Sequence, residues 1–255
     1  MTDMARDWDE LARINAAYSI VSTPEFESAD AERLDSFWES GRLEVEGILG
    51  GLVLGSTSGM TLVEIGCGIG RMTRALAARF GRIIALDVSP EMIDRARRNN
   101  PNLANVEFRV GSGVDLAGIP DRSVDVVFSW FVLQHLPREA DVLRYVEDAG
   151  RVLRDGGTAF LHIQTSRNAL DHSRRWIERK LYYSLPARVR DAVFARGSSR
   201  LEQSFAAHFR VWRGGFVRPR GVTRAAQASG LIVRDAKPLG DRYTCFTLRK
   251  GTTSE

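Results

Sequence analysis

The chain has 255 residues, a length that suits one substantial hydrophobic core with elaborations better than two independent domains. A hydrophobic share of 44% and a charged share of 27% are typical of a globular protein, and the longest apolar stretch, 124–133, is interrupted and too short to cross a bilayer. We therefore expect no membrane span. The net charge is only +4, so we expect the basic residues to lie on solvated helix faces and expect no nucleic-acid partner.

The N-terminal segment 1–55 is predicted to be helical. Its first seven residues lack the charged-then-apolar pattern of a secretory signal, so we expect the protein in the cytoplasm. Apolar residues recur at helical spacing over 6–17 and over 29–49, which predicts two amphipathic helices. Glycine-rich stretches follow them and lead into the next part of the chain.

A glycine-rich turn is the most informative feature of the chain. An apolar strand is predicted over 61–65, and it runs straight into Gly66, Cys67, Gly68 and Gly70 before a helix over 71–79. Glycines adopt backbone angles that are closed to other residues, and they let a ligand approach the main chain closely. The free N–H groups at the start of the helix then point toward that ligand.

Two acidic residues narrow the choice of ligand. Glu64 stands two residues before the first glycine, and Asp87 ends the next predicted strand, 82–87. Ionised carboxylates accept hydrogen bonds from ribose hydroxyls and attract a cationic group. The ligand is therefore expected to carry a ribose and a cationic or zwitterionic tail, and S-adenosylmethionine (SAM) meets both conditions.

Strands and helices then alternate, as a parallel sheet requires. Ser89 and Pro90 are expected to cap and open a helix after strand 82–87. The remaining elements predicted up to residue 165 are strands 106–110, 124–131 and 158–164 and a helix over 140–153. Residues 60–165 are thus expected to form the ligand-binding core.

The C-terminal part, 220–250, is predicted to contain a helix and a β-hairpin. Strands are expected over 231–237 and 243–249, and only five residues separate them. Because a parallel crossover needs a dozen or more residues, these two strands should pair antiparallel. The long stretch 166–219 before them is rich in aromatic residues, and a loop of that length usually is functional or carries its own helices.

Four ordered blocks between residues 61 and 164 carry a family resemblance. The run E-x-G-x-G-x-G after a strand resembles motif I of the class I SAM-dependent methyltransferases, whereas a dinucleotide fingerprint would need glycine where the chain has Arg71. The other blocks are 87–93, 125–129 and 151–157, in family order. The resemblance implies a single α/β domain over 1–255, Rossmann-like, with seven strands in a mostly parallel sheet. It further implies a C-terminal antiparallel hairpin whose last strand is inserted between two earlier ones, a helical cap at 166–219 and SAM as the cofactor. The cap and the N-terminal helices together are expected to enclose the substrate.

The chemistry of SAM then assigns roles to residues. The glycine turn with Glu64 should hold the methionine end, Asp87 the ribose hydroxyls, and Val88 with Met92 the adenine. Family members often use an aspartate after the third strand for the adenine amine, but this chain has Ser112 there, so the contact is left open between Ser112, a main-chain carbonyl and Asp115. The expected cofactor-binding residues are Glu64, Gly66, Cys67, Gly68, Gly70, Asp87, Val88, Met92, Ser112, Gly113, Ser129 and Trp130.

His135 is the candidate catalytic base. It lies five residues beyond Trp130, at the strand end where the methyl group should be presented, and an imidazole with a pKa of about 6.5 suits proton removal near neutral pH. Because similar turns occur in the family whatever the acceptor, a structural histidine is an equal alternative. His162, within a strand, and His208, within the expected cap, compete for the role. No metal is expected, since neither a metal-ligand spacing nor a carboxylate at the end of the fourth strand is present.

These features predict a SAM-dependent methyltransferase that acts on a small or medium-sized acceptor. A hydroxyl of a sugar, glycoside or other natural product is the favoured acceptor. The alternatives are an RNA or protein methyltransferase and a SAM-binding scaffold without catalysis. The sequence does not indicate the oligomeric state.

Overall fold

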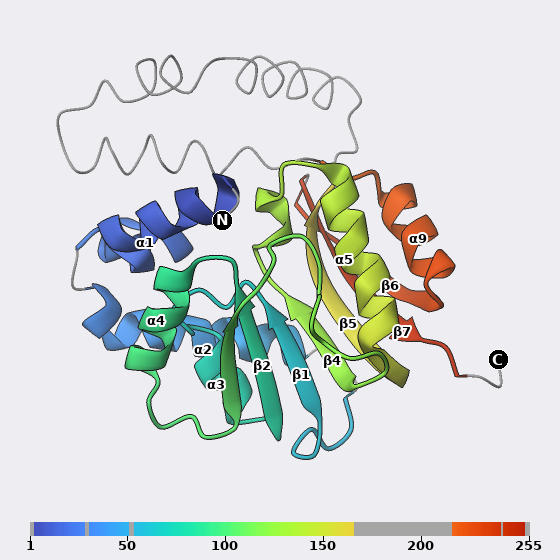
Figure 1. The fold of residues 1–255 in the computed structure, drawn as a ribbon, viewed down its shortest axis with the longest axis horizontal. Coiled ribbons are helices and arrows are strands. Elements are labelled where there is room, and N and C mark those ends of the chain that lie inside the picture. The colour runs from blue at the N-terminus through green and yellow to red at the C-terminus, as the bar shows by residue number, and fades with distance from the viewer. Residues whose placement is uncertain (1–2, 29–30, 51–53, 166–215, 241, 253–255) are drawn as a thin grey trace, which may run out of the picture.

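The computed structural model describes residues 3–28, 31–50, 54–165, 216–240 and 242–252 (Figure 1). These residues form one seven-stranded sheet with strand order β3-β2-β1-β4-β5-β7-β6 and helices on both faces. The sheet confirms the predicted α/β fold class. The expected helical cap at 166–219, which includes His208, lies outside the described residues except for its last four positions.

The first five strands run parallel to one another, and β7 is the strand that runs antiparallel to its two neighbours. β5 pairs with β7 and β7 with β6, both antiparallel, so the last strand of the chain is inserted between two earlier ones, as predicted. The strands are β1 (Thr61–Ile65), β2 (Arg82–Asp87), β3 (Val106–Val110), β4 (Val124–Ser129), β5 (Leu153–Gln164), β6 (Leu231–Leu239) and β7 (Tyr243–Lys250).

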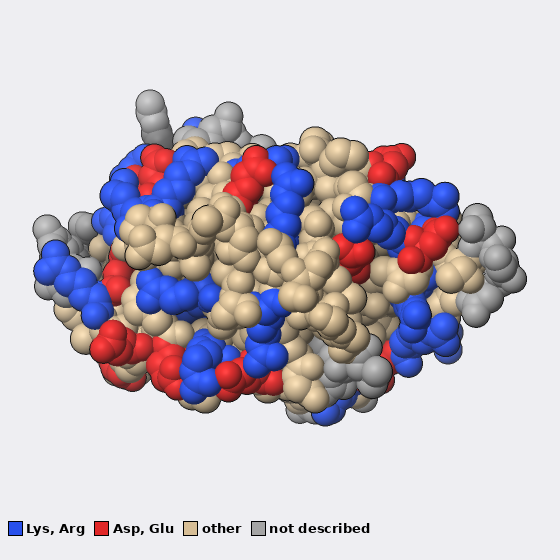
Figure 2. Space-filling model, turned by 90° about the horizontal axis from the view of Figure 1, so that it is seen from below, with Lys and Arg blue, Asp and Glu red and all other residues tan. Residues whose placement is uncertain are grey.

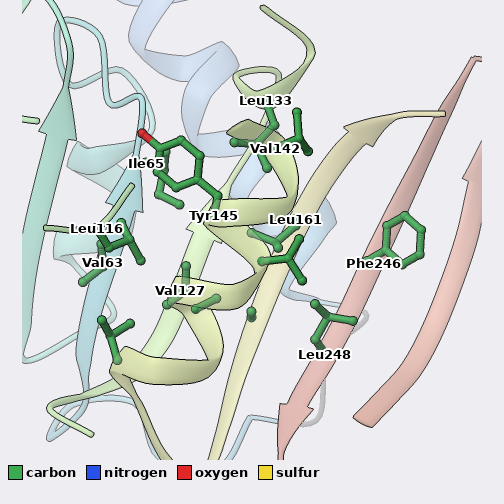
Figure 3. Close-up of a cluster of buried hydrophobic side chains, with 14 of the residues drawn as sticks. Val63, Ile65, Leu116, Val127, Leu133, Val142, Tyr145, Leu161, Phe246 and Leu248 are labelled. Atoms are coloured by element: carbon green, nitrogen blue, oxygen red, sulfur yellow. The ribbon is translucent and has the colours of Figure 1, made fainter. Parts of the chain in front are cut away.

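Alternation along the strands builds a core on each face of the sheet. Val63 and Ile65 point to the face covered by α5 (Glu139–Val152) and α9 (Pro219–Ala228), which Figure 3 shows in close-up. Leu62 points to the opposite face. The helices on that second face are α2 (Asp35–Leu49), α3 (Thr73–Ala77) and α4 (Pro90–Asn99).

The N-terminal segment forms α1 (Asp3–Ile20), which lies beside α4 (Figure 1). Alanines of α1 share a small apolar core with Phe37 of α2 and Met92 of α4. The helix predicted over 29–49 is shorter than expected, because Leu34 is extended and α2 begins only at Asp35; a 3-10 turn, Ala31–Arg33, precedes it.

Three further boundaries differ from the sequence prediction. α3 is confined to Thr73–Ala77, because the residues before it remain in the glycine turn. β5 begins at Leu153, directly after α5, so the Gly156–Gly157 pair lies inside the strand. β4 ends at Ser129, two residues early, since Phe131 adopts a left-handed φ of 55° that no strand accommodates.

Basic and acidic side chains are interspersed on the face shown in Figure 2. Several arginines of the described residues are paired with carboxylates, among them Arg82 with Glu107 at 3.2 Å and Arg151 with Asp148 at 2.9 Å. No helix in the described part of the chain is long and apolar enough to span a membrane.

Candidate active site

A cavity lies at the carboxyl ends of β1, β2 and β4, where ligands bind in open α/β sheets. Two parts of its wall differ in chemistry. The turn end comprises Glu64, Gly66, Gly68 and Asp87, and the aromatic end comprises Trp8, Trp130, Phe131 and His135. The predicted residues that line the cavity are Glu64, Gly66, Cys67, Gly68, Asp87, Val88, Met92, Gly113, Trp130 and His135.

The glycine turn after β1 depends on backbone geometry that only glycine supplies without strain. Gly66 has a φ of 73° and Gly68 a φ of 54°, and a Cβ on Gly66 would lie 2.3 Å from Cγ2 of Val132. The amides of Gly66 and Cys67 both donate to the carbonyl of Leu86, at 2.7 and 2.9 Å. These bonds hold the turn against the end of β2 and bring it next to Asp87.

Asp87 presents a part-buried carboxylate to the cavity. Its Oδ2 accepts a hydrogen bond from the amide of Gly68 at 2.9 Å, and its Oδ1 accepts one from the amide of Ser89 at 2.9 Å. Burial raises the pKa of Asp87 to about 6, and the two amides oppose that rise. Each carboxylate oxygen can accept a further hydrogen bond, so Asp87 is suited to bind the two hydroxyls of a diol.

Glu64 places a second buried carboxylate at the turn end. Its Oε2 accepts a hydrogen bond from the hydroxyl of Thr73 at 2.6 Å. Burial raises the pKa of Glu64 to about 7, while the charge of nearby Arg71 and the Thr73 bond hold it down. A cationic group on a ligand would stabilise the ionised form of this side chain.

Arg71 is the buried counter-charge at this end of the cavity. Its guanidinium donates to Ser40 Oγ at 3.0 Å and to Glu44, while its Nε has no partner among the described residues. Sequence analysis used Arg71 only to reject a dinucleotide motif. Its position on the cavity wall comes from packing against α2, which the local sequence does not reveal.

Three predicted cofactor residues do not line the cavity. Gly70, with a φ of 87°, faces Asn100, whose Nδ2 would lie 2.6 Å from a Cβ there. Ser112 is exposed and donates through Oγ to Asp115 Oδ1 at 2.6 Å. Ser129 is buried within the sheet, and its Oγ has no partner in the described part of the chain. Asp115, left open as an alternative to Ser112, does line the cavity.

The aromatic end joins residues that are far apart in the sequence. The Trp8 ring, from α1, meets the His135 ring edge-on at a centroid distance of 5.1 Å. Trp130 and Phe131 contact each other at 5.4 Å, and Phe131 is held in a left-handed conformation that is costly for a bulky residue. His135 lies in a short 3-10 turn, Leu133–His135, next to Gln134, whose Nε2 is 3.2 Å from His135 Nε2.

His162 lies behind the aromatic end and does not line the cavity. Its ring packs against Phe131, Trp130 and Tyr243 at centroid distances of 4.4, 4.9 and 4.7 Å. Neither ring nitrogen has a hydrogen-bond partner within the described ranges. Burial lowers the pKa of His162 to about 4, so the ring is neutral and a weak base at neutral pH.

The sequence predicted that the N-terminal helices enclose the substrate, but not which residues of α1 line the cavity, and the contribution of α5 was missed. Met4, Trp8 and Ile20 of α1 line the cavity, as does Tyr145 of α5, whose ring lies beside Ile65 in Figure 3. The apolar stripe on the predicted N-terminal helix was the available signal, but it does not tell which part of the sheet the helix covers. No group of three or more potential metal ligands is found in the part of the chain that the structure describes.

Comparisons with known proteins agree with this geometry. Residues 63–161 match the sequence profile of a family described as a methyltransferase domain. The chain is 32% identical over 105 residues to a demethylmenaquinone methyltransferase of Tropheryma whipplei, a match that covers 41% of this chain and 42% of the relative. It is 33% identical over 104 residues to a ubiquinone biosynthesis O-methyltransferase of Xanthomonas campestris, covering 40% of this chain and 42% of the relative. The matches thus span less than half the length of these relatives.

Solved structures share the fold over nearly the whole chain. A geranyl diphosphate C-methyltransferase from Streptomyces coelicolor superimposes with a TM-score of 0.58 at 16% identity, covering 97% of this chain and 96% of the other. A SAM-dependent methyltransferase from Aquifex aeolicus gives a TM-score of 0.52 at 17% identity, covering 94% and 97%. At these identities the likeness is one of fold.

Proposed function

We propose that this chain, whose residues 63–161 match a methyltransferase domain family, binds SAM in the cavity described above and methylates a small or medium-sized acceptor. The favoured acceptor group is a hydroxyl. The proposal extends the family assignment from the matched segment to the activity of the whole chain.

One observation carries the proposal: the turn end offers two carboxylates, the buried Glu64 and the part-buried Asp87, beside a glycine turn. Asp87 is held by amides from the turn and from the start of α4, so its free lone pairs suit the two ribose hydroxyls. Glu64 suits the ammonium group of the methionine tail, and Gly66 leaves the space that a Cβ would fill. The donor set therefore fits SAM.

Other predicted residues complete the cofactor site in this proposal. Val88 and Met92 flank the adenine, and Asp115, one of the alternatives left open by the sequence, binds the adenine amine. Ser112 then holds Asp115 through the 2.6 Å hydrogen bond between their side chains. Trp130 stands where the methyl-bearing end of the cofactor would reach the aromatic end.

When bound, SAM supplies an electrophilic methyl group on a sulfonium. The protein's task is to align the acceptor oxygen with that group and to exclude water, and positioning of this kind is worth several kcal/mol. Trp8, Trp130 and Phe131 provide the apolar walls for this alignment. His135, at the rim of the same cavity, takes the proton from the acceptor hydroxyl.

The residues that line the aromatic end also indicate which chemical class of acceptor fits there. Trp8, Trp130, Phe131 and Val132 give it an apolar and aromatic surface. Such a surface favours a natural product, or a glycoside of one, over a bare sugar, because a bare sugar needs several directed hydrogen bonds. A relative at 33% identity is named an O-methyltransferase, which agrees with a hydroxyl acceptor.

Titration calorimetry with S-adenosylhomocysteine (SAH) tests the cofactor site. The wild-type protein should bind SAH, and Asp87→Asn should weaken binding about tenfold to a hundredfold, because hydrogen bonds from hydroxyls to a carboxylate are about twice as strong as neutral ones. Asp94→Asn is the matched control, since its side chain is 57% exposed on α4. Equal affinities for the three proteins would contradict the proposed ribose contact.

Turnover separates an enzyme from a binding scaffold. Purified protein is incubated with SAM and a panel of hydroxylated natural products, and SAH release is measured. Acceptor-dependent SAH release is expected. SAH binding without release over acceptors that include RNA and protein substrates would favour the scaffold, and release only with a macromolecule would favour the RNA or protein alternative.

A further inference from the structure

A carboxylate from outside the matched segment lies against the cofactor site. Asp9, on α1, is only 4% exposed although it is an acidic residue near the N-terminus. Its Oδ1 accepts hydrogen bonds from Ser89 Oγ at 2.6 Å and from the amide of Glu91 at 3.0 Å. α1 is thereby fastened to the first turn of α4, next to which it lies in Figure 1.

Ser89 connects this carboxylate to Asp87. The Ser89 hydroxyl donates its single proton to Asp9 and accepts the amide of Met92 at 3.1 Å, so both functions of the hydroxyl are committed. The main-chain amide of the same residue donates to Asp87 Oδ1 at 2.9 Å. The orientation of one oxygen of Asp87 is therefore set by a residue that Asp9 holds in place.

The charges of the two carboxylates oppose each other. Burial works to raise the pKa of Asp9, but the bonds from Ser89, Glu91 and Arg13 outweigh it and leave the pKa lowered. Asp9 is thus ionised, and its charge helps to raise the pKa of Asp87. An apolar contact between α1 and α4 would hold the two helices together without this repulsion. Packing alone therefore does not account for a buried charge at position 9.

We propose that Asp9 is a positioning residue of the cofactor site, which holds Ser89 so that its amide orients the Asp87 carboxylate toward the ribose hydroxyls. The inference rests on the proposed function, and it extends the cofactor site to α1, outside residues 63–161. The same helix supplies Met4, Trp8 and Ile20 to the cavity wall, so the hydrogen bond to Asp9 links the position of that wall to the residue that orients Asp87.

Calorimetry with SAH on a set of variants tests this coupling. Asp9→Ala should weaken SAH binding about tenfold, because it removes the acceptor that fixes Ser89. Asp9→Asn keeps an oxygen at the same place and should bind SAH within about twofold of the wild type. Arg13→Ala removes the ion-pair partner of Asp9, a side chain that is 63% exposed, and SAH affinity should also stay within about twofold of the wild type.

A double-variant cycle distinguishes positioning from a merely structural role. If Asp9 acts through Asp87, adding Asp9→Ala to Asp87→Asn should weaken SAH binding less than twofold further. A full tenfold further loss in the double variant, or an Asp9→Ala protein that binds like Arg13→Ala, would overturn the inference. Failure of the wild type to bind SAH would instead overturn the proposed function. If Asp9→Ala does not fold, Asp9→Asn provides the test, and a tenfold loss of SAH affinity in Asp9→Asn would contradict the positioning role of Asp9.

Discussion

The two ends of the cavity are built on different principles. At the turn end, Asp87 and Glu64 each have hydrogen-bond partners, and the shape comes from main-chain turns at Gly66 and Gly68. At the aromatic end, the walls are side chains from α1 and from the residues after β4. Of the six buried side-chain polar atoms without a partner among the described residues, five lie at or next to this end: Ser129 Oγ, Trp130 Nε1, Gln134 Oε1 and both ring nitrogens of His162. The sixth, Arg71 Nε, lies at the turn end.

The two ends therefore differ in the origin of their specificity. Satisfied carboxylates on rigid turns provide a fixed set of acceptors, which suits a ligand that never changes. Unsatisfied buried polar atoms cost free energy, and together with the left-handed Phe131 they store strain beside the aromatic end. We therefore expect substitutions at the turn end to affect cofactor binding and those at the aromatic end to affect turnover.

The largest expected effect is at Gly66. Gly66→Ala adds a methyl group 2.3 Å from Val132 Cγ2 at a φ of 73°, so strain and overpacking together should lower the free energy of unfolding by about 2–4 kcal/mol. Displacement of the turn should also abolish measurable SAH binding. Thermal unfolding and calorimetry with SAH check both effects.

Gly118→Ala is the matched control for Gly66→Ala. Gly118 has a φ of 82° but nothing within 4 Å of its Cβ position, so only the backbone strain of about 1 kcal/mol is expected, with SAH affinity unchanged. Wild-type SAH affinity in Gly66→Ala would show that the turn end does not hold the cofactor.

The turn end was the part of the site that the sequence could predict, because its chemistry is local. A strand, glycines with positive φ and an acid at the next strand end follow one another in the sequence, and Ser89 caps α4 as its position predicts. The β6–β7 hairpin was predictable because its connection is too short for any crossover.

The rest of the site could not be predicted, because it is formed by contacts between segments that are far apart in the sequence. The sequence of α1 predicts an amphipathic helix, but it does not predict that Trp8 meets His135 or that Asp9 meets Ser89. Ser112 was placed by family position, whereas a local turn directs its hydroxyl to Asp115. The conformation of Phe131 has no local signal, since left-handed angles are rare for bulky residues.

At the aromatic end, His135→Ala should lower kcat by about a hundredfold to ten-thousandfold, the usual contribution of a general base. SAH affinity should stay within about twofold, because the turn end is untouched. Steady-state kinetics with an acceptor from the panel and calorimetry with SAH measure the two quantities. A parallel loss of SAH affinity would assign His135 a structural role.

His162→Phe is the comparison that keeps this assignment falsifiable. Phenylalanine preserves the aromatic packing against Phe131 and Tyr243 but removes both ring nitrogens. Because the pKa of His162 is about 4, the ring contributes little as a base at neutral pH, and turnover should be retained. A loss of kcat as large as that of His135→Ala would move the base to His162.

The smallest expected effect is on the pH dependence of SAH affinity, which distinguishes the contribution of Glu64 from that of Asp87. A bound ammonium and bound hydroxyls favour the ionised forms of Glu64 and Asp87, so SAH affinity should fall as pH falls through the pKa of each group, about 7 and about 6. Wild-type affinity should therefore begin to weaken below pH 7, by about tenfold for each pH unit below a pKa.

Glu64→Gln removes the first of these two steps. The SAH affinity of this variant should be lower than that of the wild type at neutral pH, but it should stay constant down to about pH 6. An unchanged profile in Glu64→Gln would contradict the contact between Glu64 and the ammonium group, while leaving the Asp87 contact to be judged by the step at the lower pH.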